Sequence, residues 1–267
     1  IGKEDAAGMR NEPTMKLSDV TVSYQLKTGP LIALDNVNLD VSEGSFVSLI
    51  GPSGCGKSTI LNLMAGYIKP TRGQVLMMGK PVEGPGPDRM VVHQSSSALL
   101  PWLSVADNVG LGLRAKGVPK AKRKEIVRNY LDLVSLGGFG DHPIYHISGG
   151  MQQRVALARA LATEAPVVLL DEPLGAIDAL QREVMQDLLL DIWNRTRRTF
   201  VLVTHSVEEA VYLSTDIVVM SARPGRVLRR SSVSFGAQAV AEGSSKVKAE
   251  QPFVTAQSEL MNQLIHG

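Results

Sequence analysis

Apolar and polar side chains alternate along the first part of the chain, between Met15 and Glu43. The alternation is interrupted once, at Lys27–Pro30, where the sequence Lys-Thr-Gly-Pro contains turn-forming residues. A period of about two is typical of strands that bury one face, and a break with glycine and proline is typical of the turn between them. This segment therefore predicts an antiparallel hairpin region.

Further along, short apolar runs alternate with longer stretches in which the apolar residues have helical spacing. The apolar runs have the length of buried strands and cover Ser45–Ile50, Val167–Leu170, Phe200–Val203 and Ile217–Met220. Helices are predicted over Ser58–Ile68, from Gly150 to about Ala162, and over Leu180–Arg195. Strands separated by helices indicate an α/β fold with a mainly parallel core sheet, whose functional groups gather at the carboxyl ends of the strands.

The strand signals fade between about residues 95 and 160. Within this region Lys120–Leu136 has apolar residues on one helical face and basic residues on the other. We therefore expect an inserted α-helical subdomain here. It belongs to a main domain over residues 15–230, which also contains the N-terminal antiparallel β subdomain.

The two ends of the chain are expected to lie outside this main domain. Residues 1–14 begin with Ile rather than Met and are predicted to be disordered or foreign to the native protein. Residues 231–267 are predicted to form a C-terminal extension. Within it, Gly243–Ser245 is expected to be a loop and Phe253–Ile265 a final helix.

Composition narrows the classes of function. The 267 residues are 44% hydrophobic, enough for one large globular unit, and the formal net charge of +2 does not indicate a nucleic-acid partner. No apolar run reaches the roughly 18 to 20 residues that cross a bilayer, so a protein that serves a membrane would lie on it. The single Cys55 and the absence of a signal-peptide pattern favour the cytoplasm.

A glycine-rich loop follows the first predicted buried strand and precedes a predicted helix. It matches the phosphate-binding P-loop at every specified position. In such a loop the glycines let backbone N–H groups approach the phosphates, Lys57 reaches the β and γ phosphates, and Ser58 can bind Mg²⁺. A chance glycine turn is the alternative, which the flanking strand and helix disfavour. Cys55 is interpreted as a small tolerated residue rather than a regulatory thiol. The predicted nucleotide-binding positions are Gly51, Pro52, Ser53, Gly54, Cys55, Gly56, Lys57, Ser58 and Thr59.

Three ionisable residues follow two neighbouring apolar strands. Asp171 ends the run Val167–Leu170, where its carboxylate would join a Mg²⁺ shell, and Glu172 is placed to orient or deprotonate an attacking water. A solvated turn is the alternative, but two acids at a buried strand end are costly unless they have a role. His205 follows the next strand, where its imidazole could contact the γ-phosphate, although a lone histidine is more often packed or at the surface.

A second glycine motif, Ile147-Ser-Gly-Gly-Met151, precedes a predicted helix. A helix start offers backbone donors and a positive dipole end to an anion, although an ordinary helix cap would read the same way. One nucleotide needs one phosphate loop. The second loop therefore implies a second nucleotide-bearing chain, with ATP shared across a dimer interface.

The P-loop, Ser148-Gly149-Gly150, the Asp171-Glu172 pair and His205 occur in the order typical of the ATPase subunits of ABC transporters. The chain resembles this family from Met15 to about Arg230. The resemblance implies ATP and Mg²⁺ as ligands, with Mg²⁺ held near Ser58, Gln94 and Asp171. It implies Lys57, Gln94, Glu172 and His205 as the catalytic set.

The same resemblance implies further contacts. Tyr24 would stack on adenine, and Gln94 would sense Mg²⁺ and a permease. Ser148–Gly150 would bind the partner chain's ATP, and the loop Leu174–Asp178 would cross the dimer interface. Plainer alternatives are strand packing for Tyr24, a surface position for Gln94 and a helix cap for Asp178. Three residues, Ile147, Met151 and His93, depart from the commonest family residues, which bears on rate or coupling.

A finer resemblance is to importers of nitrate, sulfonates and taurine. It is carried by Glu83–Arg89, Leu99–Trp102 and Pro224–Val227, while the tail from Ser231 to Phe253 is most similar to taurine importers. It implies a homodimer beneath a membrane permease dimer, at the cytoplasmic face, served indirectly by a periplasmic or surface solute-binding protein. Leu99–Leu103 would either receive a permease helix or pack in the core.

Other functions stay open at this point. The ATPase could serve nitrate, bicarbonate or another small solute. A soluble, non-transport ABC ATPase that acts on nucleic acid or translation is a less favoured alternative. Such a protein would usually carry tandem cassettes or a long insertion, whereas this chain has one cassette and a near-neutral charge. A small-molecule kinase also uses a P-loop with Mg²⁺, but it leaves Ser148–Gly150 unexplained.

Overall fold

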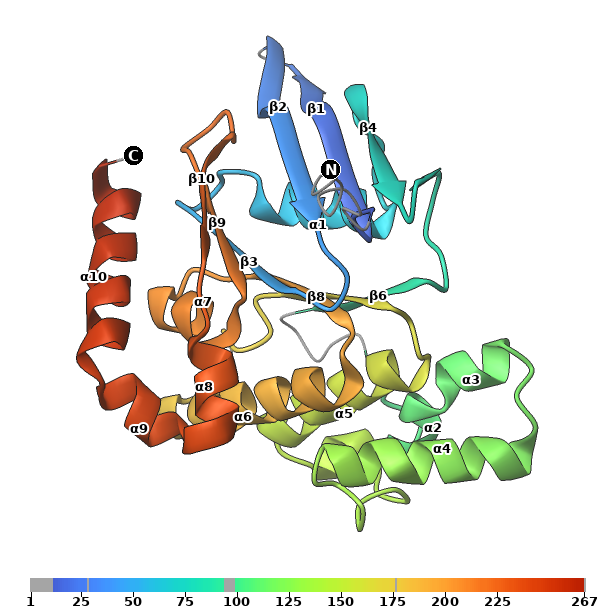
Figure 1. The fold of residues 1–267 in the computed structure, drawn as a ribbon. Helices are drawn as coiled ribbons and strands as arrows, with labels where there is room; N and C mark the ends of the chain where they lie inside the picture. Colours follow the sequence, from blue (N-terminus) through green and yellow to red (C-terminus); the bar gives the residue numbers. More distant parts are fainter. Residues whose placement is uncertain (1–11, 28, 94–98, 176, 267) are drawn as a thin grey trace, which may run out of the picture.

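The computed structural model describes residues 12–27, 29–93, 99–175 and 177–266, which form two sheets with helices around them (Figure 1). The larger sheet has the strand order β10-β9-β3-β8-β7-β6, and the smaller one has the order β2-β1-β4-β5. This arrangement confirms the predicted α/β class, with a mainly parallel core sheet, an antiparallel β subdomain and a helical subdomain.

Five neighbouring strands of the larger sheet are parallel, and β10 pairs antiparallel with β9 at one edge. Their bounds are β3 (Phe46–Ile50), β6 (Arg89–His93), β7 (Val167–Asp171), β8 (Thr199–Val203), β9 (Asp216–Met220) and β10 (Val227–Ser232). The central strands are mostly apolar because a parallel sheet is covered on both faces. Along β7, Val167 and Leu169 face one core, while Val168 and Leu170 face the other.

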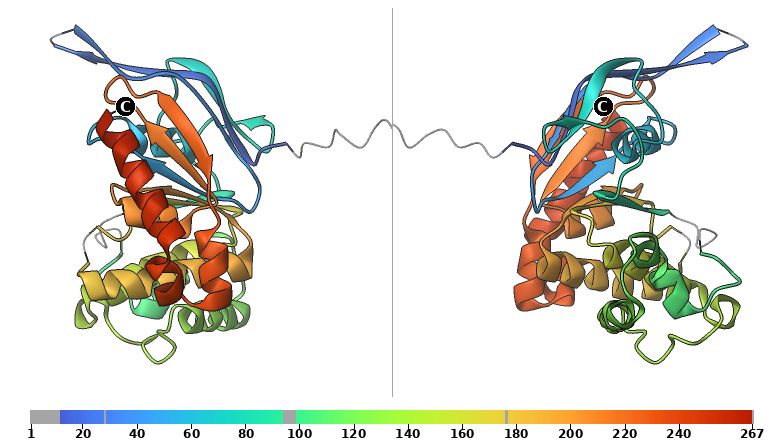
Figure 2. Two further views of the ribbon diagram at one scale, coloured as in Figure 1. Left: turned by 60° about the vertical axis from the view of Figure 1, so that its left-hand side comes forward. Right: turned by 90° about the vertical axis from the view of Figure 1, so that its right-hand side faces the viewer.

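Helices cover both faces of this sheet. The helix α1 (Lys57–Ala65) packs in the core shared with the antiparallel sheet, and α5 (Gly149–Ala162), α6 (Ala179–Thr196) and α7 (Val207–Leu213) pack in the core on the opposite face. Figure 2 shows the same layering from two other sides. The carboxyl ends of the parallel strands are thus held between the two layers.

The predicted hairpin is present as β1 (Met15–Leu26) paired antiparallel with β2 (Gly29–Val41). Two strands that the sequence analysis did not predict complete the smaller sheet, β4 (Arg72–Met77) and β5 (Lys80–Pro81). The alternation seen in the sequence buries one face of this sheet against α1.

The helical subdomain contains α2 (Val105–Val109), α3 (Leu111–Ala115) and α4 (Lys120–Leu133), which pack beside α5. The segment before α2 is held by Asn108, whose side-chain amide forms hydrogen bonds with the backbone of Leu100, Leu103 and Ser104. Leu99 is buried in the core, whereas Trp102 is 75% exposed. The stretch Leu99–Leu103 therefore combines core packing with an exposed aromatic side chain.

The C-terminal part forms three helices, α8 (Phe235–Glu242), α9 (Ser244–Ala249) and α10 (Gln251–His266). The predicted loop at Gly243–Ser245 is wrong, because Ser244 already begins α9. Only Gly243, at φ 95°, separates the two helices. The predicted final helix is confirmed and is longer than expected. None of the described helices is both long and apolar enough to span a bilayer.

Candidate nucleotide-binding site

The P-loop joins β3 to α1 at the carboxyl edge of the core sheet. Gly56, which immediately precedes α1, has a φ of 100°, a conformation that residues with a Cβ atom rarely adopt. A Cβ atom here would also lie 2.5 Å from Cδ2 of Leu34. Backbone conformation and packing therefore both require glycine at the point where the loop enters the helix.

Lys57 places its ammonium group inside this loop. Its Nζ donates hydrogen bonds to the carbonyl oxygens of Gly51 (2.7 Å) and Pro52 (3.1 Å), and the residue is only 7% exposed. Cys55 is fully buried beneath it, with Sγ 3.7 Å from Nζ. The lysine charge therefore lies where a P-loop receives phosphate oxygens.

Asp171 reaches the P-loop from the end of β7. Its Oδ1 accepts a hydrogen bond from the hydroxyl of Ser58 (3.2 Å), which bridges 113 residues of chain. Burial raises the pKa of Asp171, and the hydrogen bond from Ser58 offsets part of this increase. The strand register also places His93 of β6 beside Asp171. The carboxylate thus lies in a partly desolvated position next to polar partners.

Glu172 and His205 lie beside each other at the same edge. Oε2 of Glu172 is 3.3 Å from Nδ1 of His205. Glu172 has a left-handed backbone (φ 46°) and donates its N–H to the carbonyl of Val203, the last residue of β8. A positive φ at a residue other than glycine costs roughly 1 kcal/mol or more, so the surrounding contacts must hold it.

Buried hydrogen bonds fix the segment that carries His205. The Thr204 hydroxyl donates to the carboxylate of Glu209 (2.5 Å) and accepts from the N–H of Ser206 (3.0 Å). Ser206 caps α7 by accepting from the N–H of Glu209 (3.3 Å). Glu209 is 4% exposed, and this burial raises its pKa. The exposed imidazole is therefore presented by a rigid turn.

These groups surround one cavity of about 570 Å³, a size typical of small-molecule sites. The predicted residues that line it are Tyr24, Ser53, Gly54, Gly56, Lys57, Ser58, Thr59, Glu172 and His205. Gly51, Pro52 and Cys55 belong to the same loop but do not line the cavity, and Asp171 contacts it through Ser58. The structure thus brings together residues from four separate parts of the chain.

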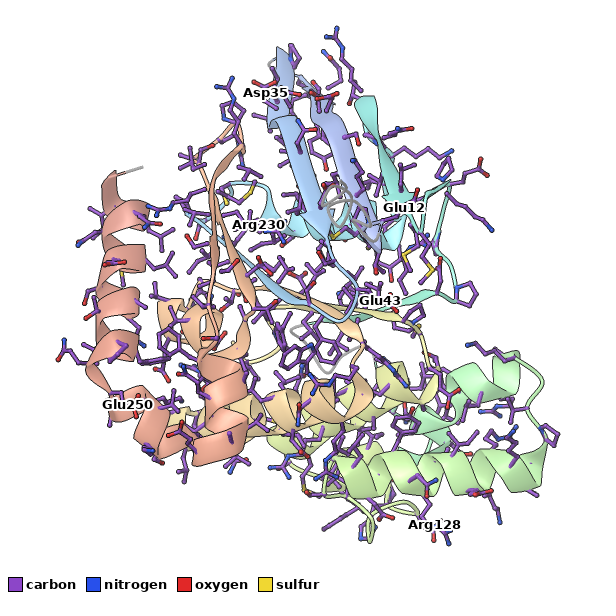
Figure 3. All side chains as sticks on the ribbon, in the orientation of Figure 1. Glu12, Asp35, Glu43, Arg128, Arg230 and Glu250 are labelled. Atoms are coloured by element: carbon purple, nitrogen blue, oxygen red, sulfur yellow. The ribbon has the colours of Figure 1, made fainter. Side chains whose placement is uncertain are left out.

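Arg223 also lines this cavity, although the sequence did not indicate it as a site residue. Its Nε and Nη2 both donate to the carbonyl of Gly54 (3.2 Å each), which lies 169 residues away in the chain. Gly225 lets this loop approach the P-loop, because a Cβ atom there would lie 1.9 Å from the carbonyl oxygen of Cys55. Arg226 pairs with Asp35, which Figure 3 labels on β2. Only the Pro-Gly-Arg turn signalled this loop.

The second glycine motif is not part of this cavity. Ser148 caps α5 by accepting from the N–H of Met151 (3.3 Å), and it is exposed together with Gly149. Asp178 likewise caps α6 by accepting from the N–H of Gln181 (3.0 Å). Within one chain both residues therefore act as helix caps, with their outer faces open to a neighbour.

Some predicted positions lie outside the described residues. These are Gln94, residues 1–11, and Ala176 within the segment Leu174–Asp178 that the family resemblance places across the dimer. The residues Leu174, Gly175, Ile177 and Asp178 of that segment are described, and they lead directly into α6.

The oxygen atoms of Ser58 and Asp171 fit Mg²⁺, which takes a hydroxyl and a carboxylate together with phosphate oxygens. Across the part of the chain that the structure describes, no three His, Cys, Asp or Glu side chains gather into a metal cluster. The donor set therefore fits a cation that shares its ligands between protein and nucleotide.

Comparison with known proteins agrees with this geometry. The family model described as "ABC transporter" matches residues 34–175. A taurine import ATP-binding protein of Burkholderia thailandensis is 49% identical over 247 residues, which cover 92% of this chain and 95% of the relative.

Two solved structures of the ABC transporter cassette MJ0796 are also similar, each at 34% identity over 82% of this chain and 98% of the other. One is a dimeric structure, with a TM-score of 0.73. The other is a dimeric post-hydrolysis state bound to ADP and Pi, with a TM-score of 0.72.

Fold and cavity together define a P-loop ATPase with a helical insertion that carries a second glycine motif. The chain belongs to the ABC transporter family. It is an ATP-hydrolysing subunit that drives transport across a membrane, and its nucleotide is ATP.

Proposed function

We propose that this subunit powers an importer for taurine or a closely related sulfonate. The observation that carries the proposal is the 49% identity to a taurine import ATP-binding protein over 92% of the chain. The matched residues also cover 95% of the relative, so the two chains are similar over nearly their whole lengths. Nitrate or bicarbonate import by the same ATPase is the second candidate, because all these solutes are small and are recognised by other subunits.

The cavity supports specific roles in ATP binding. Tyr24, which is 40% exposed at the cavity wall, would stack on adenine, while the P-loop glycines and Thr59 would face the phosphates. The Lys57 ammonium would exchange its carbonyl partners for phosphate oxygens, which bind it more strongly because they are charged. Binding would therefore cost the loop two hydrogen bonds and replace them with stronger ones.

The acids at the strand ends support a role in hydrolysis. Ser58 and Asp171, together with Gln94, would hold Mg²⁺, which neutralises charge on the phosphate oxygens when it is bound. Glu172 would orient the attacking water and accept its proton, and His205 would contact the γ-phosphate from the adjacent strand end. The 3.3 Å contact between Glu172 and His205 brings both groups to one side of the cavity.

A second copy of this chain would complete each site. Ser148–Gly150 lie outside the cavity of their own chain and present a helix start to the outside, as expected of groups that bind a neighbour's phosphates. The similar cassettes are dimeric, one of them with ADP and Pi bound. The homodimer would lie at the cytoplasmic face of the membrane beneath two permease subunits, with a solute-binding protein on the other side.

The experiment that tests this function uses the intact membrane complex. ATP turnover is measured after adding the solute-binding protein loaded with taurine, nitrate or bicarbonate, each at the same concentration. Stimulation by the taurine-loaded protein alone is expected. Stimulation by nitrate or bicarbonate alone would assign the second candidate.

A Glu172→Gln complex provides the control for the chemistry. Because the amide cannot accept the proton of the attacking water, this variant should bind ATP and release no phosphate with any solute. Undiminished phosphate release would remove Glu172 from the role of base without affecting the choice of solute.

A further inference from the structure

A second cavity lies in the helical subdomain, among α2, α3, α4 and the loop after α4. It has a volume of about 430 Å³ and shares no lining residue with the nucleotide cavity. In Figure 1 the green helices α2, α3 and α4 lie at the opposite end of the molecule from the antiparallel sheet. The predicted nucleotide chemistry does not use this cavity.

The floor of this cavity is apolar. Ala106, Val127 and Leu131 supply apolar side chains to its lining. Gly140 also lines the cavity, and a Cβ atom there would lie in ordinary van der Waals contact with Ala106 and Leu131, 3.6 Å from each. The floor therefore offers contact area for an uncharged part of a ligand.

The remaining lining is strongly basic. Five cations line the cavity, namely Arg114 from α3 and Lys120, Arg123, Lys124 and Arg128 from α4. Figure 3 labels Arg128 where it projects from α4. Two acids, Asp107 and Asp141, also line it, and Asp107 accepts a hydrogen bond from Ser104 (3.0 Å). Within the described residues, none of the five cations forms an ion pair with an acid.

The helix α4 gains no stability from this arrangement. Lys120, Lys124 and Arg128 follow one another at intervals of four residues, and like charges at that spacing repel each other on a helix. The first turn contains no acid, so its cations also face the positive end of the helix dipole. Both unfavourable effects would be relieved by a bound anion.

A merely solvated helix face explains this pattern less well. Such a face usually intersperses acids with bases at helical spacing. The two acids of α4, Glu125 and Asp132, do not line the cavity, and neither forms an ion pair among the described residues. The positive charge is thus concentrated on the wall of a cavity instead of being balanced along the helix.

We propose that this cavity binds a ligand with one or more phosphate groups. The guanidinium groups of Arg114, Arg123 and Arg128 are suited to paired hydrogen bonds with phosphate oxygens, and Lys120 and Lys124 add charge beside them. The phosphate belongs either to a free phosphorylated metabolite or to a phospholipid headgroup. The apolar floor takes the uncharged part of the ligand in both cases.

The test uses the full chain with its P-loop filled by saturating ADP and without added Mg²⁺. Inorganic tripolyphosphate is titrated by calorimetry to represent the free ligand, and vesicles of phosphatidylcholine with or without phosphatidylglycerol represent the headgroup. The variant Lys120→Gln/Lys124→Gln removes two cations of the cavity. The control Lys69→Gln/Lys122→Gln removes two lysines that do not line it.

Binding of tripolyphosphate or of the phosphatidylglycerol vesicles should weaken about tenfold or more in the cavity variant, because charge-assisted contacts are lost. Binding by the control should stay within about twofold of the unmodified chain, and binding by the unmodified chain should weaken with added salt. The probe that binds identifies the source of the phosphate. Equal binding by the cavity variant and its control, or no binding of either probe, would overturn the proposal.

The fold of the cavity variant is checked by circular dichroism. Because both lysines are exposed and like-charged, their removal should leave the melting temperature unchanged or slightly higher. If the double variant does not fold, the single variant Arg128→Gln is tested instead. Arg128 is exposed, so this variant should fold and should still bind the probe more weakly than the unmodified chain. Unchanged binding by a folded Arg128→Gln protein would count against the proposal.

Discussion

Charged residues at the strand ends of the core sheet lower the stability of the fold but are needed for function. Asp171 shows this most clearly. It ends an apolar strand and is partly desolvated, which raises its pKa. The folded chain therefore binds the proton of Asp171 more tightly than the unfolded chain does. Above the raised pKa the folded protein carries an unfavourable negative charge, which a bound Mg²⁺ would offset.

A pH prediction follows from the direction of this shift. The contribution of Asp171 to stability falls as pH rises from the unfolded pKa, about 3.8, through the raised folded pKa. In the same window acidification protonates the carboxylate, so ATP turnover should decline at a pH above the ordinary aspartate pKa. A pH profile of phosphate release at limiting Mg²⁺ measures this, because saturating Mg²⁺ would compete with the proton and keep the carboxylate ionised.

The matched variant is Asp171→Asn, which keeps an oxygen for the Ser58 hydroxyl but has no charge. Without nucleotide it should melt at the same or a higher temperature than the unmodified chain at pH 7, and it should hydrolyse no ATP. A clear fall in melting temperature would show that the carboxylate is stabilising in the folded chain and would contradict the argument from burial.

Arg223 is the charged residue of the nucleotide cavity that the sequence did not indicate, and its charge suggests a role in binding. Replacing it by Ala removes two hydrogen bonds to the P-loop and one of the cations of the cavity wall. We expect the Kd for ATP to rise about fivefold to tenfold, or ~1 kcal/mol. Arg229→Ala is the control, because Arg229 is exposed on β10 and lines neither cavity. Equal affinities for the two variants would assign Arg223 no part in binding.

At the scale of elements, the C-terminal helices are an integral layer of the fold. Phe253 of α10 is 1% exposed and makes edge contacts with the rings of Tyr212 in α7 (6.3 Å) and Phe235 (5.2 Å). Lys248 of α9 lies 4.5 Å from the centre of the Tyr212 ring and forms an ion pair with Glu208 (2.8 Å). These contacts hold α7, the helix that follows His205.

Truncating Phe253 should therefore destabilise the whole chain. Phe253→Ala removes a buried ring from between two others, a change that costs about 3–5 kcal/mol of the free energy of unfolding. Val254→Ala is the neighbouring control, because Val254 is 43% exposed, and it should cost less than about 0.5 kcal/mol. Chemical denaturation of both variants measures the difference. Equal effects would mean that α10 is not firmly packed on α7.

The elements that the sequence predicted well are those whose signals are local. The strands Phe46–Ile50 and Val167–Asp171 each contain four apolar residues out of five. The P-loop is defined by residues that follow one another in the chain. The strand β6, with bounds Arg89–His93, was missed because it lies at the sheet edge and is only partly buried. A local pattern gives little indication of such a strand.

Contacts between distant segments mark the limit of sequence reasoning at the site. The family resemblance placed Ser58 and Asp171 around one ion, and the structure joins them directly. The approach of Arg223 to Gly54 depends on how β9 and the turn after it pack on the P-loop, and no periodicity in the sequence encodes this. The junction between α8 and α9 shows the same limit, since the single residue Gly243 separates the two helices where a longer loop was expected.

At the scale of the whole molecule, the described chain contains a nucleotide cavity and, outside it, the capped helix start at Ser148. A head-to-tail dimer would bring the helix start of each chain to the cavity of the other. Each composite site would then need an intact Lys57 from one chain and an intact Ser148 from its partner. A site shared between two chains in this way predicts that two inactive variants can complement each other, which a site within one chain does not.

Two inactive variants should restore activity when they are mixed. Lys57→Ala damages the P-loop and Ser148→Arg blocks the helix start, so each homodimer should hydrolyse almost no ATP. A mixed dimer contains one doubly damaged site and one fully intact site. Random exchange makes half of the dimers mixed, so about a quarter of the sites should be intact. Phosphate release after unfolding and refolding the two variants together, against each refolded alone, measures this. Activity of the mixture no higher than that of its components would show that each chain completes its own site.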